Sequence, residues 1–204
     1  MLNPYTITAL VLVLLIFGYL RGNYGHKKAL IAYQELEDKF NLTLNAKRSF
    51  FVRSLELKGT IDGYQFKIFE ENRSDGDEGT DTYTIITFVG QLRQFNYTIR
   101  RENMLTKIGS AIGVKDIQVG HDFVDKKYRF KSNRSALLQA ICDYEVQSRL
   151  EANLAQFKGD LKHSPTKLKY ETTGRLHHNG KYEEIVTTIE LMRLLLGKEK
   201  ALRT

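Results

Sequence analysis

The sequence predicts an α+β fold, in which an N-terminal single-pass transmembrane helix precedes an antiparallel sheet covered by amphipathic helices. Three observations lead to this prediction: an uncharged apolar run near the N-terminus, β-branched and aromatic segments joined by short turns, and apolar residues at helical spacing. Of the 204 residues, 42% are hydrophobic and 27% are charged, the balance of an ordinary globular protein. We expect an anchor over residues 1–22 and one α+β domain over residues 26–204.

The predicted anchor is Pro4 to Leu20, which reads PYTITALVLVLLIFGYL and carries no charge over 17 residues. A membrane-spanning helix needs about 17–25 such residues. Tyr5 and Tyr19 stand near the two ends, where aromatic rings favour the membrane interface. No basic residue precedes the run and no small-x-small cleavage site follows it, so we expect a retained anchor and not a cleaved signal peptide.

Basic residues on one side of the anchor predict its orientation. Arg21, Lys27 and Lys28 follow the apolar run, and positive charge stays on the cytoplasmic side of a membrane. The domain after the anchor should therefore be cytoplasmic. The single cysteine, Cys142, agrees with a reducing compartment because it has no partner for an internal disulfide.

Strands are predicted from residue 54 onward. The segments SLELKGTI (54–61) and YQFKIFEE (64–71) flank Asp62-Gly63, a dipeptide that favours a type I′ hairpin. Further strands are predicted at 82–93, 95–102, 116–119, 128–132, 160–164 and 167–174. Because short turns join most of these segments, we expect an antiparallel sheet.

Helices are predicted where apolar residues recur every three to four positions. After an interruption at Gly22 and Gly25, an amphipathic helix is expected to reach Phe40. The others are expected at 103–113, at 144–157 with Asp143 as its N-cap, and from about Tyr182 to the C-terminus. These helices should cover one face of the sheet.

One stretch concentrates chemistry-bearing side chains: KDIQVGHDFVDKKYRFKSN, residues 115–133. His121, Asp122 and Asp125 could form an acid–base or metal site, with Lys126 and Lys127 as basic neighbours. The alternative is a structural corner in which an aspartate, Asp122 above all, accepts hydrogen bonds from backbone amides. The spacing matches no catalytic or metal motif, so we favour the corner and predict no catalytic residue, metal or cofactor.

The same stretch resembles a bacterial family of uncharacterised, membrane-anchored α+β domains. The family pattern runs Asp-Ile-x-x-Gly-Asp-x-x-Phe-Asp-Arg-Arg-Phe-x-x-Lys after a short helix. The residues that fit it are Asp116, Ile117, Gly120, Asp125, Lys126, Lys127, Tyr128 and Lys131. His121 replaces an aspartate and Val124 a phenylalanine, and the weak likeness extends from about Phe40 to Leu196. The resemblance implies a protein anchored in the bacterial inner membrane and implies no activity.

Three functional hypotheses follow. The first is a non-catalytic, membrane-anchored domain that binds a partner protein or supports an assembly. The second is docking on anionic lipid, since the chain carries a net charge of +7, with basic residues at Lys27, Lys28, Lys47, Arg48 and Arg53. The third is a hydrolase-like enzyme that uses the region of His121, Asp122 and Asp125. Nucleic acid is not expected as a partner, because no arginine-rich tract, zinc-finger spacing or aromatic RNA-binding signature is present.

Overall fold

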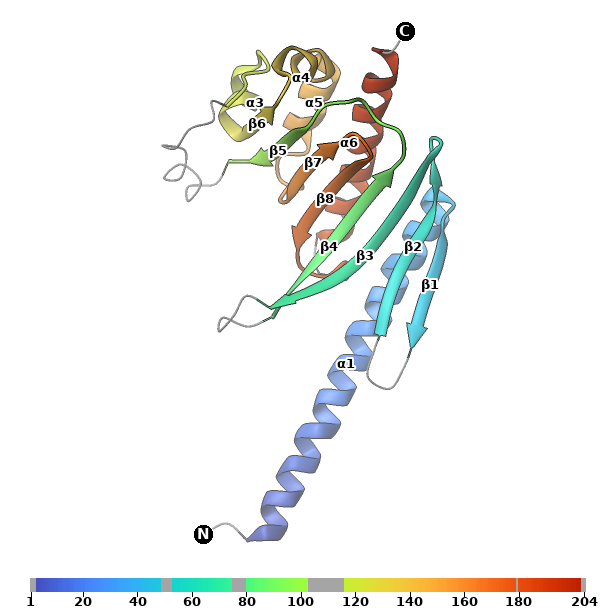
Figure 1. The fold of residues 1–204 in the computed structure, drawn as a ribbon. Coiled ribbons are helices and arrows are strands. Elements are labelled where there is room, and N and C mark those ends of the chain that lie inside the picture. Colours follow the sequence, from blue (N-terminus) through green and yellow to red (C-terminus); the bar gives the residue numbers. More distant parts are fainter. Residues whose placement is uncertain (1–2, 49–52, 75–79, 103–115, 179, 203–204) are drawn as a thin grey trace.

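The protein consists of one eight-stranded antiparallel sheet, a layer of helices on one of its faces, and a long N-terminal helix (Figure 1). The computed structural model describes residues 3–48, 53–74, 80–102, 116–178 and 180–202. The helices are α1 (Pro4–Phe40), α3 (Asp122–Lys127), α4 (Ser135–Ile141), α5 (Tyr144–Ala152) and α6 (Lys181–Ala201). The strands are β1 (Thr43–Arg48), β2 (Arg53–Ile61), β3 (Tyr64–Ser74), β4 (Thr80–Val89), β5 (Tyr97–Arg101), β6 (Tyr128–Ser132), β7 (Asp160–Ser164) and β8 (Lys167–Thr173).

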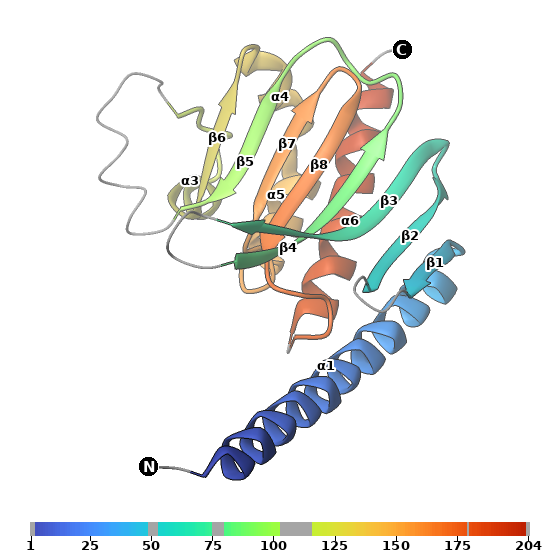
Figure 2. The same cartoon turned by 60° about the horizontal axis from the view of Figure 1, so that its bottom comes forward.

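The spatial order of the strands is β1-β2-β3-β4-β8-β7-β5-β6, which Figure 2 shows across the sheet. The first four strands follow the chain, and Asp62 and Gly63 turn β2 into β3 with φ angles of 52° and 85°. Two successive positive φ angles are those of the predicted type I′ hairpin. The last two hairpin strands, β7 and β8, enter between β4 and β5 and so bring distant parts of the chain together.

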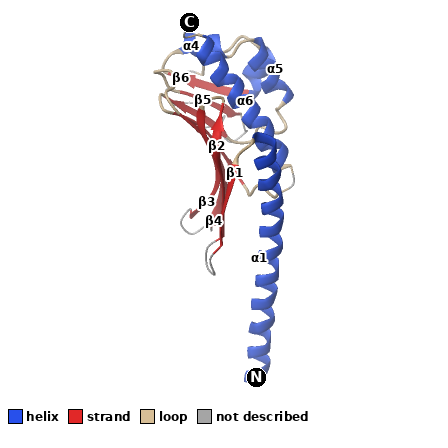
Figure 3. Ribbon diagram, turned by 90° about the vertical axis from the view of Figure 1, so that its right-hand side faces the viewer, coloured by secondary structure: helices blue, strands red, loops and turns tan. Residues whose placement is uncertain are grey.

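The core lies between the sheet and the helices. Figure 3 shows the strands on one side and the helices α1, α4, α5 and α6 on the other. From α6, Ile185, Ile189 and Met192 are completely buried, and from α1, Tyr33 and Leu36 are completely buried. The predicted α+β class, the antiparallel sheet and the one-sided helix layer are therefore confirmed.

Helix α1 differs from the prediction because it is continuous. Gly22 and Gly25 lie inside it and do not interrupt it, and the helix extends over 37 residues. Only its C-terminal part packs on the domain, through buried Ala29, Tyr33 and Leu36. The N-terminal part projects away from the sheet (Figures 1 and 3).

The predicted transmembrane anchor is wrong. Within the described residues, no helix combines the length and the apolar character that a membrane crossing requires. The uncharged run has 17 residues, the lower limit for a spanning helix, and Arg21 follows it within the same helix. The single-pass inner-membrane placement, with a cytoplasmic domain after residue 22, was drawn from this anchor and is corrected with it.

Three further differences concern local structure. Strand β1, TLNAKR, was not predicted, but Leu44 and Ala46 alternate in it and it pairs with β2 over its whole length. Residues 116–119 are not a strand, although the Ile117 amide donates to the Phe130 carbonyl at 2.8 Å. The helix predicted at 103–113 lies outside the described residues.

A first buried polar cluster ties α6 to the sheet. The Lys181 ammonium donates to Glu184 Oε2 at 2.7 Å and to Thr172 Oγ1 at 3.0 Å. The Tyr170 hydroxyl donates to Glu184 Oε1 at 2.8 Å and accepts from the Gly159 amide at 2.7 Å. Lys181 is 7% exposed and Glu184 is fully buried, so this ion pair is closed to solvent.

A second buried cluster lies nearer the C-terminal end of α6. His163 Nε2 is 3.1 Å from Glu199 Oε2, and its Nδ1 is 3.0 Å from the Phe95 carbonyl oxygen. The Tyr97 hydroxyl donates to Glu199 Oε1 at 3.1 Å, and the Tyr97 ring stacks on His163 at 4.5 Å. Burial and the adjacent Glu199 raise the pKa of Tyr97 well above its usual value, so the phenol stays a donor.

Candidate functional site

The corner at residues 116–132 uses its polar side chains on its own backbone. The Asp125 carboxylate accepts from the amides of Val119 at 2.8 Å, Gly120 at 3.0 Å and His121 at 3.2 Å. Both carboxylate oxygens are therefore engaged by backbone donors. Gly120 has a φ of 86°, which permits the sharp turn that presents these amides.

The remaining corner residues do not converge on Asp125. His121 is the N-cap of α3, and its Nδ1 accepts from the Val124 amide at 3.4 Å. The N-cap is thus His121, and the prediction that Asp122 takes this place is wrong. His121 Nε2 lies 3.7 Å from Glu151 Oε2, while Asp122 is exposed. The three predicted side chains His121, Asp122 and Asp125 therefore do not converge on one point, and the backbone contacts of Asp125 and His121 are those of a structural corner.

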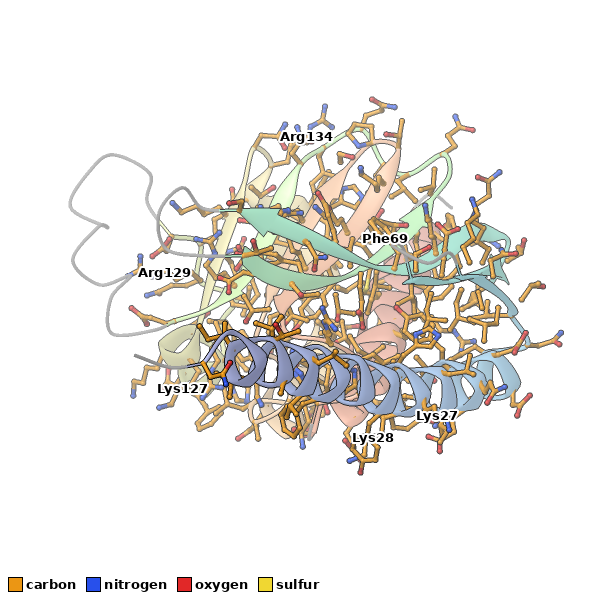
Figure 4. The ribbon with its side chains drawn as sticks, turned by 90° about the horizontal axis from the view of Figure 1, so that it is seen from below. Lys27, Lys28, Phe69, Lys127, Arg129 and Arg134 are labelled. Atoms are coloured by element: carbon orange, nitrogen blue, oxygen red, sulfur yellow. The ribbon has the colours of Figure 1, made fainter. Side chains whose placement is uncertain are left out.

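The basic residues singled out from the sequence lie on separate elements. Lys126 and Lys127 are exposed at the end of α3, and Lys27 and Lys28 are exposed on α1. Figure 4 shows Lys27 and Lys28 on α1, well apart from Lys127. Arg21 also belongs to α1. Of the residues considered for lipid docking, Lys47 and Arg48 belong to β1, and Arg53 begins β2.

Other reactive groups of the described residues are buried. The His163–Glu199–Tyr97 cluster has a catalytic residue composition, but His163 is 4% exposed and Glu199 is 2% exposed. Burial raises the pKa of the Cys142 thiol to about 12, so the thiolate nucleophile is not populated near neutral pH. Among the described residues, no group of three or more His, Cys, Asp or Glu is placed to hold a metal ion.

The face of the sheet opposite the helices carries a different kind of feature. Successive strand residues point to opposite faces, so the register identifies which side chains share the open face. One line of paired positions crosses all eight strands, and we call it the basic row. It consists of Thr43, Lys58, Lys67, Thr87, Lys169, Lys162, Thr98 and Lys131.

Five lysines and three threonines thus stand side by side with no acidic residue in the same row. Neighbouring strands are about 4.8 Å apart, so the row extends about 29 Å from Lys58 on β2 to Lys131 on β6. Within the described part of the chain, no helix covers this face (Figure 3). In Figure 4, Phe69 lies on the side of the sheet away from α1.

The next row on the same face is of mixed charge. It consists of Asn45, Glu56, Phe69, Ile85, Glu171, Asp160, Arg100 and Arg129. Glu56 pairs with Lys58 at 2.6 Å and also with Lys67, and Glu171 pairs with Lys169 at 2.5 Å. Hydrogen bonds from Arg73 and then from Lys169 lower the pKa of the Glu171 carboxyl to about 2, although its partial burial acts in the opposite direction.

Positive charge therefore remains unneutralised at one end of the basic row. Lys162 and Lys131 are exposed, and no carboxylate of the described residues forms an ion pair with either. They flank Thr98 on the strands β7, β5 and β6. A surface hollow of about 270 Å³ at this end is lined by Thr98, Arg100, Arg129 and Lys131.

A second hollow, of about 310 Å³, lies at the other end of the row. Lys58, Lys67 and Thr87 are among its lining residues. Both hollows present ammonium, guanidinium or hydroxyl donors to solvent, which are groups that bind anions without a chemical reaction. The open face therefore carries cationic and hydroxyl side chains at both ends of the basic row.

Sequence reasoning missed this surface because its lysines are scattered from residue 58 to residue 169. Each lies in a strand that was predicted, but the strand order was not, and only the order β4-β8-β7-β5-β6 aligns them. Comparison with protein-family models and with curated proteins finds no match to this chain. The resemblance to a family of anchored domains stays a prediction.

Proposed function

We propose that the protein is a non-catalytic docking domain that binds an anionic partner on the open face of its sheet. The observation that carries this proposal is the basic row, in which five lysines share one solvent-facing line. Glu56 and Glu171 form ion pairs with Lys58, Lys67 and Lys169, so the cations left for a partner are Lys162 and Lys131. An anionic group placed between these two lysines would gain charge-assisted contacts without breaking an ion pair of the chain itself.

The exposure and the shared positive charge of the unpaired lysines support the proposal. Lys162 and Lys131 are exposed, so their charge is available to a partner without breaking an internal ion pair. A cluster of one sign attracts an oppositely charged partner and speeds its association, an effect that salt weakens.

The chemistry of the rest of the molecule supports binding over catalysis. The aspartate at the corner, Asp125, is engaged by three backbone amides, and the histidine-containing cluster around His163 is shut off from solvent. Each of these groups has a structural role in the described part of the chain. These contacts favour the docking proposal over the hydrolase-like hypothesis.

Charge reversal on the row tests the proposal. Lys131→Glu/Lys162→Glu changes the charge of the full chain by four units and removes the two unpaired cations. The matched control is Lys39→Glu/Lys200→Glu, which makes the same change at exposed positions on α1 and α6. After crosslinking in cells that make the protein, the row variant should lose the material that co-purifies with the native chain.

The control variant should keep that material, because its charges lie on the helix layer and not on the open face. Equal loss in both variants would show a response to net charge alone. Retention in the row variant would contradict the proposal directly, since the two most available cations of the face would then contribute nothing.

A further inference from the structure

The composition of the open face narrows the class of partner, and this step rests on the docking function proposed above. We infer that the partner is an acidic segment of a protein, laid across the strands along the basic row. Four features of the face favour this chemistry over a phosphodiester backbone.

The first feature is the mixed charge of the neighbouring row. Glu56, Glu171 and Asp160 stand two residues along their strands from lysines of the basic row, about 7 Å away. A nucleic acid strand carries a charge on every phosphate and would meet these carboxylates as well as the lysines. An acidic protein segment alternates carboxylates with neutral or basic side chains and can match both rows.

The second feature is the state of the aromatic rings on this face. Proteins that bind single-stranded nucleic acid use open aromatic faces on which bases stack. Here Phe69 is half-buried and the Lys67 ammonium lies 4.6 Å from its ring centre. Tyr83 is half-buried as well, with the Arg73 guanidinium 4.6 Å from its ring centre. A cation already faces each ring, so neither offers a free stacking surface.

The third feature is the spacing of donors along the row. Lys58 and Lys67 form one pair on adjacent strands, and Lys169 and Lys162 form another. Thr87 lies between the two pairs, Thr98 lies after the second pair, and Lys131 is the last residue of the row. The row is about 29 Å long, which corresponds to about nine residues of extended chain or about 19 residues of α-helix. A segment of this length can place separate carboxylates opposite the lysines and neutral groups opposite the threonines.

The charges at the β5–β6 end suit carboxylates in particular. Arg100 is ion-paired with Asp160, and Arg129 Nη2 lies 3.0 Å from Glu102 Oε1, so both guanidiniums already bind carboxylates of the chain itself. Lys131, which lines the same hollow, has no such partner in the described residues. A carboxylate of the partner at Lys131 would form the same kind of ion pair that Arg100 and Arg129 form within the chain.

Binding of three defined probes to the full chain tests this inference. The probes are a 20-residue peptide with glutamate at every second position, an oligothymidylate of 12 nucleotides, and vesicles of phosphatidylcholine with phosphatidylserine. Fluorescence anisotropy, or sedimentation for the vesicles, gives each affinity at low and at moderate salt. We expect the acidic peptide to bind at least tenfold more tightly than the oligonucleotide.

The variants separate this inference from the docking function. Lys131→Glu/Lys162→Glu should weaken peptide binding at least tenfold, and Lys39→Glu/Lys200→Glu should change it less than twofold. If the oligonucleotide or the vesicles bind best and depend on the same two lysines, the inferred partner class is wrong while the docking function survives. If no probe responds to the row variant, both are wrong.

Discussion

The buried pair Lys181–Glu184 gives the most quantitative test of how the helix layer is held. Replacing Glu184 by leucine leaves the Lys181 ammonium, 7% exposed, with the Thr172 hydroxyl as its remaining partner. It also removes the acceptor of the buried Tyr170 hydroxyl. Breaking a buried ion pair by removing one partner costs about 3–5 kcal/mol, because the other charge stays buried and uncompensated.

Removal of both charges should cost much less. In Lys181→Met/Glu184→Leu no unpaired charge remains, and apolar pairs of similar volume are often neutral relative to a buried salt bridge. We expect the double variant to lose about 1–2 kcal/mol, mainly from the unsatisfied Tyr170 hydroxyl. The double variant should therefore be about 2–3 kcal/mol more stable than Glu184→Leu alone.

Urea unfolding followed by circular dichroism measures these free energies. With a slope of about 2–3 kcal/mol per molar urea, Glu184→Leu should lower the midpoint by about 1–2 M. The matched surface control is Lys58→Met, which breaks an exposed pair with Glu56 and should cost less than about 1 kcal/mol. A loss in the double variant as large as in Glu184→Leu would refute the argument that an uncompensated buried charge dominates.

Three other predictions follow from single contacts. Burial raises the pKa of Glu70, against the opposing effect of a hydrogen bond from the Leu176 amide, so the ionised carboxylate is disfavoured in the fold. Glu70→Gln should therefore be more stable than the native chain at pH 7, and denaturation at several pH values should show this difference vanish as the pH falls below about 4.5. Gly159→Ala would place a Cβ against the Glu171 carbonyl oxygen and should lower the free energy of unfolding by about 2–3 kcal/mol, as a thermal melt would show. The control is Gly197→Ala in α6, whose added Cβ meets nothing within 4 Å, so this variant should be as stable as the native chain or more stable. Asp125→Ala removes the acceptor of three backbone amides and should lower the free energy of unfolding by about 1–3 kcal/mol, while acidic-peptide binding stays unchanged. A variant of full stability that loses peptide binding would show that the corner takes part in binding.

Local signals in the sequence were sufficient for most elements of the fold. Asp62-Gly63 predicted the first hairpin, and Asp143 predicted an N-cap, which it forms by accepting from the Val146 amide at 3.2 Å. The strand predicted at 128–132 is β6, and its alternating Tyr128 and Phe130 rings are both in the core. These features depend on neighbours within a few residues, so they can be predicted from the chain alone.

Features that depend on distant pairing could not be predicted. Strand β1 pairs with the edge of β2, and the alternation of Leu44 and Ala46 within TLNAKR is too short a signal to predict that pairing. The lysines of the basic row come from five different strands, and their alignment requires the insertion of β7 and β8 between β4 and β5. The predicted anchor was wrong for a different reason. Its uncharged run was only as long as the shortest membrane-spanning helix, and α1 continues through Arg21 as one helix.

The projecting part of α1 remains an exposed apolar surface. Ile7, Leu10, Val11, Leu12, Val13 and Phe17 are each between 49% and 63% exposed. A helix that is apolar on several sides is usually covered by other atoms, and nothing in the described structure identifies what covers this one. The docking function does not depend on it, because the basic row lies on the opposite side of the sheet from the helix layer (Figure 3).

The most direct test of the central claim is the reactivity of single lysines towards an amine-labelling reagent, in cells and in the purified full chain. Lys131 and Lys162 should lose at least half of their labelling in cells, because a bound anionic partner shields them. Lys39 and Lys200, exposed on the helices, should label equally in both settings. Equal labelling of Lys131 and Lys162 in cells and in the purified protein would contradict the claim that the open face of the sheet is occupied.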